Sequence, residues 1–348
     1  MDGRGAVTVS VVIPVRNGAR TLEGCLAGLA RQSRRPEEIV VVDNGSEDGS
    51  GSLARAFGSR APHLRLHVVE ERRVGASAAR NRGVAESAGE VIAFTDADCE
   101  PAPEWLDRLL AGFGPGIGAV AGRVRPAVPQ TAIEAFCALY TLRSGTRAFD
   151  SRRFTGLRGG FPTANLAVPR HVFDSAGGFD EGVRIYGEDY DLCARIYGLG
   201  HVIRYEPRAT VFHRHRTTLG GLLRQSYGFG TSHAYLLRRH FRRKTLIELP
   251  ARVWERDDLP GRVWLDLASP DKKLLALLLS SLWLPPLWLV LLAYVAYLYV
   301  ESSRRFRAED FPPSLAARLV APPLLVAKAT AMSAGRLVGS VRFGAVCL

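Results

Sequence analysis

Short apolar runs alternate with longer segments of mixed polarity along the first third of the chain. The segments at 21–32 and 75–87 have helical patterns, and Leu22, Leu26 and Leu29 fall on one face of the first. The apolar runs are rich in β-branched residues and lie at 8–14, 38–43, 64–70 and 90–95. Runs of this kind between helices are typical of βαβ units, so the pattern predicts an α/β fold with a parallel sheet covered by helices.

Polar residues directly follow three of these predicted strands. They lie at 14–17 after the first strand, at 43–46 after the second and at 96–98 after the fourth. Ligands of open α/β sheets bind at the carboxyl ends of the parallel strands, where the connecting loops meet. We therefore expect a nucleotide pocket at this edge, with carboxylates at its far end. We expect the less regular region at 116–240 to bind the acceptor.

An uncharged stretch of 27 residues runs from Leu274 to Val300. It exceeds the roughly 20 residues that a helix needs to span a bilayer. Pro285 and Pro286 lie near its middle, where proline breaks or kinks a helix, so one tilted span and two half-helices both fit. Basic residues flank both ends, which favours a re-entrant hairpin with both ends in the cytosol. A buried helix of a soluble protein is the alternative.

The segment 316–343 mixes apolar runs with basic residues, so an interfacial amphipathic helix and a second span are both open. We expect a catalytic domain at 1–243, a linker or interfacial segment at 244–273, and a transmembrane or re-entrant membrane module at 274–348. The first residues lack a signal-peptide pattern and the five cysteines are isolated from one another. We therefore expect the catalytic domain to face the cytoplasm. Because of the uncharged stretch, we expect the protein to be localised at the cell membrane.

The formal net charge of +12 suits an anionic membrane, nucleic acid or phosphorylated substrates. No nucleic-acid-binding module is recognised, so we do not expect nucleic acid as a partner. A basic cluster from Arg238 to Lys244 precedes the uncharged stretch, where it would meet anionic lipid head groups. A solvated helix face is the alternative for this cluster.

Acidic residues gather at the predicted ligand-binding edge. Asp43 ends the second strand, Asp96 and Asp98 follow the fourth, and Glu188 and Asp189 lie where a helix begins. An Asp-x-Asp arrangement after a buried strand suits a hard divalent cation that also takes oxygen ligands from a diphosphate. A solvated turn is the alternative for an isolated Asp-x-Asp.

Four segments follow one another in the order VSVVIPVRNGARTL, VVDNGSEDGS, GASAARNRGVAESAGEVIAFTDADC and GEDYDLCAR. Together they resemble the motifs of family 2 glycosyltransferases, from about Val9 to Gly230. The resemblance implies a GT-A fold, in which a Rossmann-like nucleotide-binding sheet is flanked by helices. It also implies inverting transfer from a nucleotide-diphosphate sugar.

The same resemblance implies roles for residues that would bind the donor. Pro14, Val15 and Asn17 would line the nucleotide base, and Asp43 would hold the base or the ribose. Arg80 would lie near the diphosphate, since guanidinium groups pair well with phosphate. An Asx-turn is the alternative for Asp43, and a surface ion pair is the alternative for Arg80.

The resemblance also implies a metal site that holds Mn²⁺ or Mg²⁺. Asp98 would bind the metal, and Asp96 would reach the sugar or ribose and also the metal. His213 is the best match to the histidine that completes the metal shell in relatives, with His215 as its competitor. Imidazole is more acceptable to Mn²⁺ than to Mg²⁺. A histidine that merely caps a strand is the alternative.

Three further residues complete the implied site. Asp189 would be the general base, because inverting transfer requires the acceptor hydroxyl to lose its proton as it attacks. Glu188 would position the acceptor or share that proton, and Asn165 would touch the donor sugar. An acidic pair favoured by the helix dipole is the alternative for Glu188 and Asp189.

The resemblance, together with the uncharged stretch, implies a membrane-associated hexosyltransferase that moves a sugar, expected to come from a UDP-sugar, to a lipid-linked or cell-envelope glycan acceptor. Membrane lipids are the other expected partner. A sugar-phosphate nucleotidyltransferase would need a glycine-rich loop after the first strand, where this chain has PVRNGAR. A catalytically silent, nucleotide-sugar-binding membrane scaffold is the remaining alternative, and Asp96, Asp98 and Asp189 together argue against it.

Overall fold

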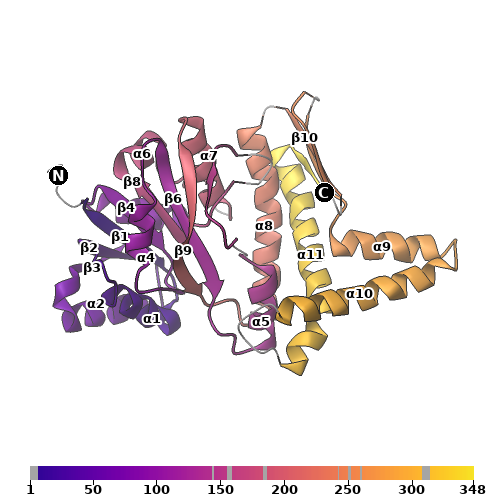
Figure 1. The fold of residues 1–348 in the computed structure, drawn as a ribbon, viewed down its shortest axis with the longest axis horizontal. Helices are drawn as coiled ribbons and strands as arrows, with labels where there is room; N and C mark the ends of the chain where they lie inside the picture. The colour runs from indigo at the N-terminus through magenta and orange to yellow at the C-terminus, as the bar shows by residue number, and fades with distance from the viewer. Residues whose placement is uncertain are drawn as a thin grey trace. The chain divides into compact units, whose positions relative to one another are not determined.

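A computed structural model of the chain describes residues 7–142, 145–154, 159–182, 186–241, 243–249, 252–258, 261–307 and 314–348. The chain divides into two compact units. The N-terminal unit comprises Met1–Ala127, Leu142–Arg184 and Glu188–Arg214, and the C-terminal unit comprises Val128–Thr141, Ile185–Gly187 and His215–Leu348. Each unit has a sheet and helices of its own (Figure 1), and each has its own buried core.

The N-terminal unit is built on a nine-stranded sheet whose parallel half contains the four predicted strands. These strands lie in the order β3-β2-β1-β4, and each is parallel to its neighbours. They are β1 (Val9–Val15), β2 (Glu38–Asp43), β3 (Leu66–Glu70) and β4 (Val91–Thr95). The observed and predicted ends agree to within two residues, so the predicted α/β class is confirmed.

The other half of this sheet is mixed. β8 (Asn165–Pro169) pairs antiparallel with both β4 and β6 (Ile117–Pro126). On its other side, β6 pairs in parallel with β9 (Val202–His213). Two short strands, β5 (Cys99–Pro101) and β7 (Phe149–Ser151), pair antiparallel with β9. The register of β5 sets Cys99 opposite His213, although more than a hundred residues separate them in sequence.

Both faces of the sheet are covered because alternate strand residues point to opposite sides. In β1, Val11 and Ile13 enter one core and Val12 enters the other. The first core also takes the fully buried Leu22 and Leu26 of the predicted helical face. The covering helices are α1 (Ala19–Ala30), α2 (Ser50–Arg60), α3 (Ala76–Ala85), α4 (Trp105–Ala111), α6 (Arg170–Ser175) and α7 (Glu188–Gly198), with a short 3-10 turn at Pro62–Leu64.

The C-terminal unit combines long helices with a second, four-stranded sheet. Its strands lie in the order β11-β10-β12-β13 and are β10 (Lys244–Leu249), β11 (Arg252–Arg256), β12 (Arg262–Asp266) and β13 (Val346–Cys347). Its helices are α5 (Ala132–Tyr140), α8 (Leu219–His240), α9 (Pro270–Ser281), α10 (Leu287–Arg307) and α11 (Leu315–Phe343).

Helices α8 and α11 lie side by side and approach each other through glycine (Figure 1). A Cβ built on Gly230 would lie 2.0 Å from the carbonyl oxygen of Met332, and one built on Gly335 would lie 2.0 Å from that of Tyr227. Neither position has room for a side chain. Glycine at both positions therefore allows the two backbones to meet.

The segment 244–273 differs from the expected linker, because strands β10, β11 and β12 lie in it. The division between the two units also falls at Arg214 rather than at residue 243, and α8 belongs to the C-terminal unit. The basic cluster before the uncharged stretch is divided as well. Lys244 is buried and pairs with Glu255 and Asp257, whereas Arg238 and Arg239 are exposed.

The uncharged stretch is not one helix. α9 ends at Ser281 and α10 begins at Leu287, and the two prolines lie in the turn between them. The interpretation as one tilted span is therefore wrong, and the alternative of two half-helices is the one observed. Among the described residues, α11 alone is long and apolar enough to cross a membrane by length and composition.

Candidate active site

The loops after β1 and β2 are tied together at the carboxyl edge of the sheet. Asn17 has a positive φ of 53°, and its side-chain oxygen accepts a hydrogen bond from the N–H of Glu47 at 2.8 Å. Its own N–H donates to the hydroxyl of Ser46 at 3.0 Å. Asn17 thus shapes the predicted nucleotide loop. Val15 is buried in the core, so its side chain does not line a base.

Asp43 ends β2 and forms the Asx-turn considered as its alternative role. Its Oδ1 accepts a hydrogen bond from the N–H of Ser46 at 2.9 Å. A Cβ built on Gly51 would lie 2.3 Å from Asp43 Oδ2, so glycine leaves the space that this oxygen occupies. The turn and the glycine together fix the carboxylate at the edge where a nucleotide is expected.

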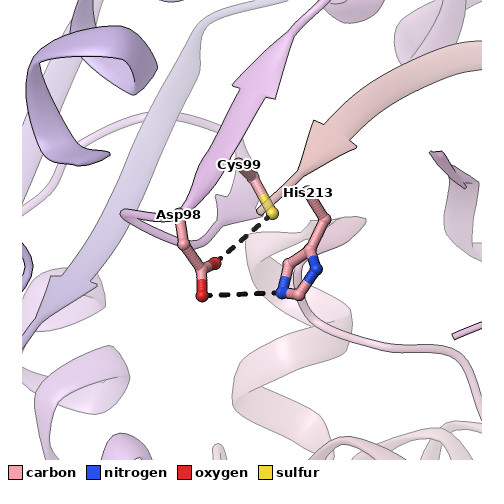
Figure 2. Close-up of side chains that lie close together, drawn as sticks. All are labelled: Asp98, Cys99 and His213. Atoms are coloured by element: carbon pink, nitrogen blue, oxygen red, sulfur yellow. Dashed lines mark hydrogen bonds and ion pairs between the residues drawn. The ribbon is translucent and has the colours of Figure 1, made fainter. Parts of the chain in front are cut away.

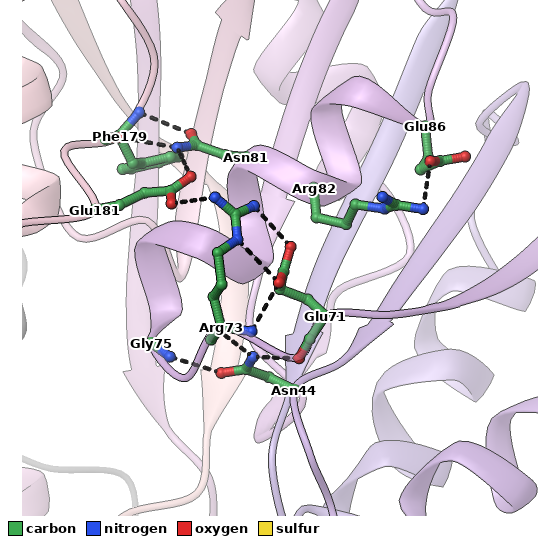
Figure 3. A network of polar contacts seen from close by, with 9 residues as sticks. All are labelled: Asn44, Glu71, Arg73, Gly75, Asn81, Arg82, Glu86, Phe179 and Glu181. Carbon is green, nitrogen blue, oxygen red and sulfur yellow. Dashed lines mark hydrogen bonds and ion pairs between the residues drawn. The ribbon is translucent and has the colours of Figure 1, made fainter.

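A polar network that the sequence analysis did not identify holds the neighbouring loop (Figure 3). The amide of Asn44 donates to the carbonyl oxygens of Glu71 and Arg73 at 2.8 and 2.9 Å, and its oxygen accepts from the N–H of Gly75 at 2.8 Å. Arg73 also pairs with the carboxylates of Glu71 and Glu181. Hydrogen bonds from Arg73 lower the pKa of Glu71 to about 2, so this network stays charged.

Arg80, on α3, joins two of the predicted acidic segments. Its guanidinium donates to Asp96 Oδ1 at 2.8 Å and to Glu188 Oε1 at 2.9 Å. The side chain is buried, so the surface ion pair considered as an alternative is excluded. Burial opposes the charge of Arg80, but Asp96 and Glu188 outweigh it and raise its pKa above the ordinary value. Arg80 therefore remains a cation at the centre of the acidic group.

Asp189 lies in the first turn of α7 beside this group. Its Oδ1 accepts a hydrogen bond from the N–H of Tyr190 at 2.9 Å. Burial raises the pKa of Asp189 to about 7, and the charge of Glu188 adds to the rise while Arg80 opposes it. A carboxylate with a pKa near neutrality is suited to accept a proton and release it again.

Asp98, Cys99 and His213 form a second cluster, and their side chains point toward one another (Figure 2). His213 Nε2 lies 3.5 Å from Asp98 Oδ2, and the Cys99 thiol donates to Asp98 Oδ1 at 3.7 Å. The antiparallel pairing of β5 with β9 produces this arrangement, and the N–H of Arg214 donates to the carbonyl oxygen of Asp98 at 2.8 Å. His215, the competitor of His213, instead contacts the hydroxyl of Thr141 at 3.3 Å.

The donor atoms of this cluster fit a divalent cation, because they all lie within 4.8 Å of one another. Carboxylate oxygen and imidazole nitrogen suit Mn²⁺ better than Mg²⁺. Burial and the charge of Asp98 raise the pKa of the Cys99 thiol well above its ordinary value, which leaves it a weak ligand for a hard ion. Asp96 is not in this cluster and pairs with Arg80.

Asn165 has a structural role. It is fully buried, its oxygen accepts a hydrogen bond from Trp105 Nε1 at 2.8 Å, and its NH₂ donates to the carbonyl oxygens of Arg123 and Ala209. These bonds stabilise the contact between β8, β6 and β9. We therefore remove Asn165 from the donor site. Trp105 gave no signal in the sequence that would have identified it as this partner.

Family models match most of the chain. The model described as glycosyl transferase family 2 matches residues 10–147, and the model described as glycosyl transferase family group 2 matches residues 91–328. The second match alone covers more than half of the chain, including α7 and the Asp98–His213 cluster.

Curated relatives carry related names. The chain is 31% identical over 227 residues to the glycosyltransferase AglE of Haloferax volcanii, covering 64% of this chain and 71% of that protein. It is 34% identical over 236 residues to the pre-mycofactocin glycosyltransferase of Mycobacterium tuberculosis, covering 67% of this chain and 48% of that protein. The chain thus spans about half the length of the second relative.

Among solved structures, the mannosyltransferase PcManGT from Pyrobaculum calidifontis, in complex with GDP-Man and Mn²⁺, superimposes with a TM-score of 0.54. The two chains are 21% identical, and the match covers 93% of this chain and 86% of the other. This likeness supports the GT-A fold. Since the family models, the relatives and the fold agree, the chain belongs to the family 2 glycosyltransferases.

Proposed function

We propose that the protein transfers a sugar from a nucleotide-diphosphate sugar to an acceptor hydroxyl with inversion of the anomeric configuration. The observation that carries this proposal is the ion-pair chain through Arg80, which joins Asp96 to Glu188. Asp98, on the donor side, is two residues from Asp96, and the proposed base Asp189 is next to Glu188. The groups that we propose to bind the metal and to accept the proton would thus lie on either side of one buried cation.

The donor would bind at the carboxyl edge of the sheet. Asp43 would accept hydrogen bonds from the base or the ribose, with Pro14 and Asn17 beside it. UDP is the nucleotide we propose. Asp98 and His213 would hold a divalent cation, for which we favour Mn²⁺ because of the imidazole ligand, with Asp96 near the sugar or ribose. When bound, such an ion neutralises charge on the departing diphosphate.

The acceptor hydroxyl would bind beside Asp189, which would take its proton. As the acceptor oxygen forms its bond to the anomeric carbon, the bond from that carbon to the diphosphate breaks, and the hydroxyl proton passes to the Asp189 carboxylate. Glu188 would orient the acceptor while it pairs with Arg80. No covalent enzyme intermediate is required, since a single displacement inverts the carbon.

We further propose that the protein acts at the cell membrane, with its catalytic unit facing the cytoplasm, on a lipid-linked or cell-envelope glycan acceptor. The apolar residues of the C-terminal unit support this proposal, because many of them are exposed on α9, α10 and α11. Exposed apolar surfaces of this kind mark sites of interaction with a membrane or with protein.

Nucleotide release by the purified full-length chain tests the proposal. UDP-, GDP- and dTDP-sugars are supplied in turn with Mn²⁺ or Mg²⁺, and the Asp98→Ala and Asp189→Asn variants are assayed in parallel. Metal-dependent release of one nucleotide that is lost in Asp98→Ala would support the proposal and identify the donor. Donor binding without turnover under all these conditions would contradict it and restore the scaffold alternative.

A further inference from the structure

The helical hairpin of α9 and α10 carries no charge from Leu274 to Val300 and is nevertheless exposed. The two helices lie against each other as an antiparallel pair that extends away from α11 (Figure 1). Helices that are apolar all round occur in protein cores or in membranes. These are not core helices, because their large apolar side chains are mostly accessible, among them Leu275, Leu279, Leu282, Leu289, Leu292 and Val300.

The tip of the hairpin is its most exposed part. Trp283, in the turn between the two helices, is 87% exposed, and Leu282 and Leu284 on either side are 67% and 60% exposed. From Leu274 to this turn the chain rises about 15 Å, and the uncharged part of α10, from Leu287 to Val300, rises about 20 Å, at about 1.5 Å per residue. Both arms are shorter than the roughly 30 Å thickness of a bilayer's hydrocarbon core. The hairpin is therefore long enough to enter one leaflet and too short to cross both.

The open end of the hairpin is anchored to protein and carries basic residues. Phe306, near the end of α10, is fully buried in a core formed with α5, α8 and α11. The hydroxyls of Tyr140 and Ser302 are 2.8 Å apart. Arg304 and Arg307 are exposed beside this anchor, where they would meet anionic lipid head groups. The basic residues at the open end would lie among the lipid head groups, and the apolar residues at the tip would lie among the acyl chains of the same leaflet.

Helix α11 is held by polar contacts that a membrane span would lose. Near its middle, Lys328 Nζ donates to the carbonyl oxygen of Tyr140 at 2.8 Å. Farther along, Arg336 pairs with Asp266 on β12 at 2.8 Å, and its guanidinium lies over the ring of Trp264 at 4.2 Å. An open sheet does not lie exposed in hydrocarbon, so this half of α11 stays outside it. The segment before Lys328 is about 20 Å long, which is too short to span.

We propose that the α9–α10 hairpin inserts into one leaflet of an anionic lipid bilayer and that α11 does not cross the membrane. The lipid-contacting surface is then the tip at residues 282–284 with the exposed sides of both helices, and α11 fixes the hairpin to the C-terminal unit. This inference rests on the proposed action at a membrane and is independent of the donor and the metal.

Vesicle flotation of the full chain tests the inserting surface. The parent, Trp283→Asp and the control Val128→Asp are added to vesicles of phosphatidylglycerol and phosphatidylcholine. Val128 is 72% exposed in the same unit but outside the hairpin. A carboxylate placed in hydrocarbon should weaken vesicle binding about 100-fold in Trp283→Asp. The control should stay within about twofold of the parent, as surface substitutions do.

Labelling from one side tests the topology. All five native cysteines are buried, so single cysteines can be introduced by Leu282→Cys, Leu315→Cys or Val341→Cys and treated with an impermeant maleimide outside preformed vesicles. The inference predicts reaction at positions 315 and 341 and protection at 282. Protection of 315 or 341 that ends when the vesicles are opened would overturn it, because α11 would then span.

Two other outcomes separate this inference from the proposed reaction. Equal flotation of Trp283→Asp and the parent would overturn insertion, as would a change of oligomeric state in Trp283→Asp without a change in vesicle binding. Nucleotide release in detergent should be the same in Trp283→Asp and the parent. If the parent released no nucleotide yet floated and labelled as predicted, the proposed reaction would fail and the insertion would stand.

Discussion

Two carboxylates of the proposed site differ in their surroundings, and the difference separates their roles. Asp98 faces an imidazole with its Oδ2 and a protonated thiol with its Oδ1, and the three side chains have ligand atoms within 4.8 Å of one another. Asp189 is half-buried beside Glu188, which favours its protonated form. A carboxylate beside an imidazole suits a bound cation, whereas one whose pKa is raised toward neutrality suits proton transfer.

The metal assignment predicts different effects for the three residues of the Asp98 cluster. Asp98→Asn should lower metal-dependent nucleotide release about 100-fold, because it removes the charged oxygen ligand. His213→Ala should raise the Mn²⁺ concentration for half-maximal activity by about tenfold or more. Cys99→Ala is the matched control and should leave that concentration unchanged, since a buried thiol is a poor ligand for a hard ion. Mn²⁺ titrations of all three variants measure these effects.

A rise in the Mn²⁺ requirement of Cys99→Ala equal to that of His213→Ala would contradict this assignment. It would mean that sulfur binds the ion, and a softer metal would then be preferred. Measuring Mn²⁺ binding by its paramagnetic signal without donor separates lost metal from lost donor affinity.

The acid–base assignment predicts the pH profile. Asp189 must be deprotonated to accept the acceptor proton, so kcat/KM should rise with pH through about 7. Glu188→Gln removes a charge that raises the pKa of Asp189, and this rise should move to lower pH. Asp189→Asn should lose about 100-fold to 10,000-fold in kcat, and the rise near pH 7 should disappear because the titrating carboxyl group is gone. A profile that Glu188→Gln leaves in place would assign the observed ionisation to another group.

At the scale of elements, the parallel half of the first sheet could be predicted from the sequence, whereas the second sheet could not. The strands β1, β2 and β4 are short apolar runs followed by turn residues. This signal is local, because the alternation of such runs with helical segments along the chain is enough to locate the strands. Strands β10 to β12 are short, carry charged residues at or near their ends and show no regular alternation, and β13 has two residues. The pairing of β12 with β13 joins residues about eighty positions apart, for which no local pattern exists.

The site shows the same limit. The acidic residues could be located because they follow strands, but their partners depend on long-range register. Arg80 meets Glu188 across more than a hundred residues, and His213 reaches Asp98 through the pairing of β5 with β9. Only the family resemblance pointed to His213. Asn165 had the wrong predicted role because its buried hydrogen bonds come from three separate elements.

The close approach of α8 and α11 predicts a strong effect of a single methyl group. Gly335→Ala would bring its Cβ within 2.0 Å of the Tyr227 carbonyl oxygen, so the helices must separate. We expect the free energy of unfolding to fall by about 1–3 kcal/mol. A Cβ built on Gly220, in α8, meets nothing within 4 Å, so Gly220→Ala should leave stability unchanged or raise it by up to about 1 kcal/mol. Thermal denaturation of both variants in detergent measures the difference.

Equal melting temperatures for Gly335→Ala and Gly220→Ala would mean that the two helices are not in backbone contact. The α11 contacts of Lys328 and Arg336 would then have to hold the helix without the glycine pair.

At the scale of the whole molecule, the chain combines a charge of +12 with an exposed apolar hairpin, and the two attract a membrane in different ways. Charge acts on anionic lipid over a distance and is screened by salt. Burial of apolar side chains in lipid acts at contact and is not weakened by salt. The dependence of membrane binding on salt therefore separates the two contributions.

We expect salt to reduce binding to anionic vesicles without abolishing it. Raising the ionic strength from about 0.1 M to about 1 M shortens the screening length from about 10 Å to about 3 Å, which removes most of the attraction between exposed charges. The residual binding should equal the binding to pure phosphatidylcholine vesicles, which should not depend on salt, and Trp283→Asp should lose it. Flotation at both salt concentrations measures this. Complete release of the parent chain at high salt would mean that charge alone holds it on the bilayer, because an inserted hairpin would keep it there.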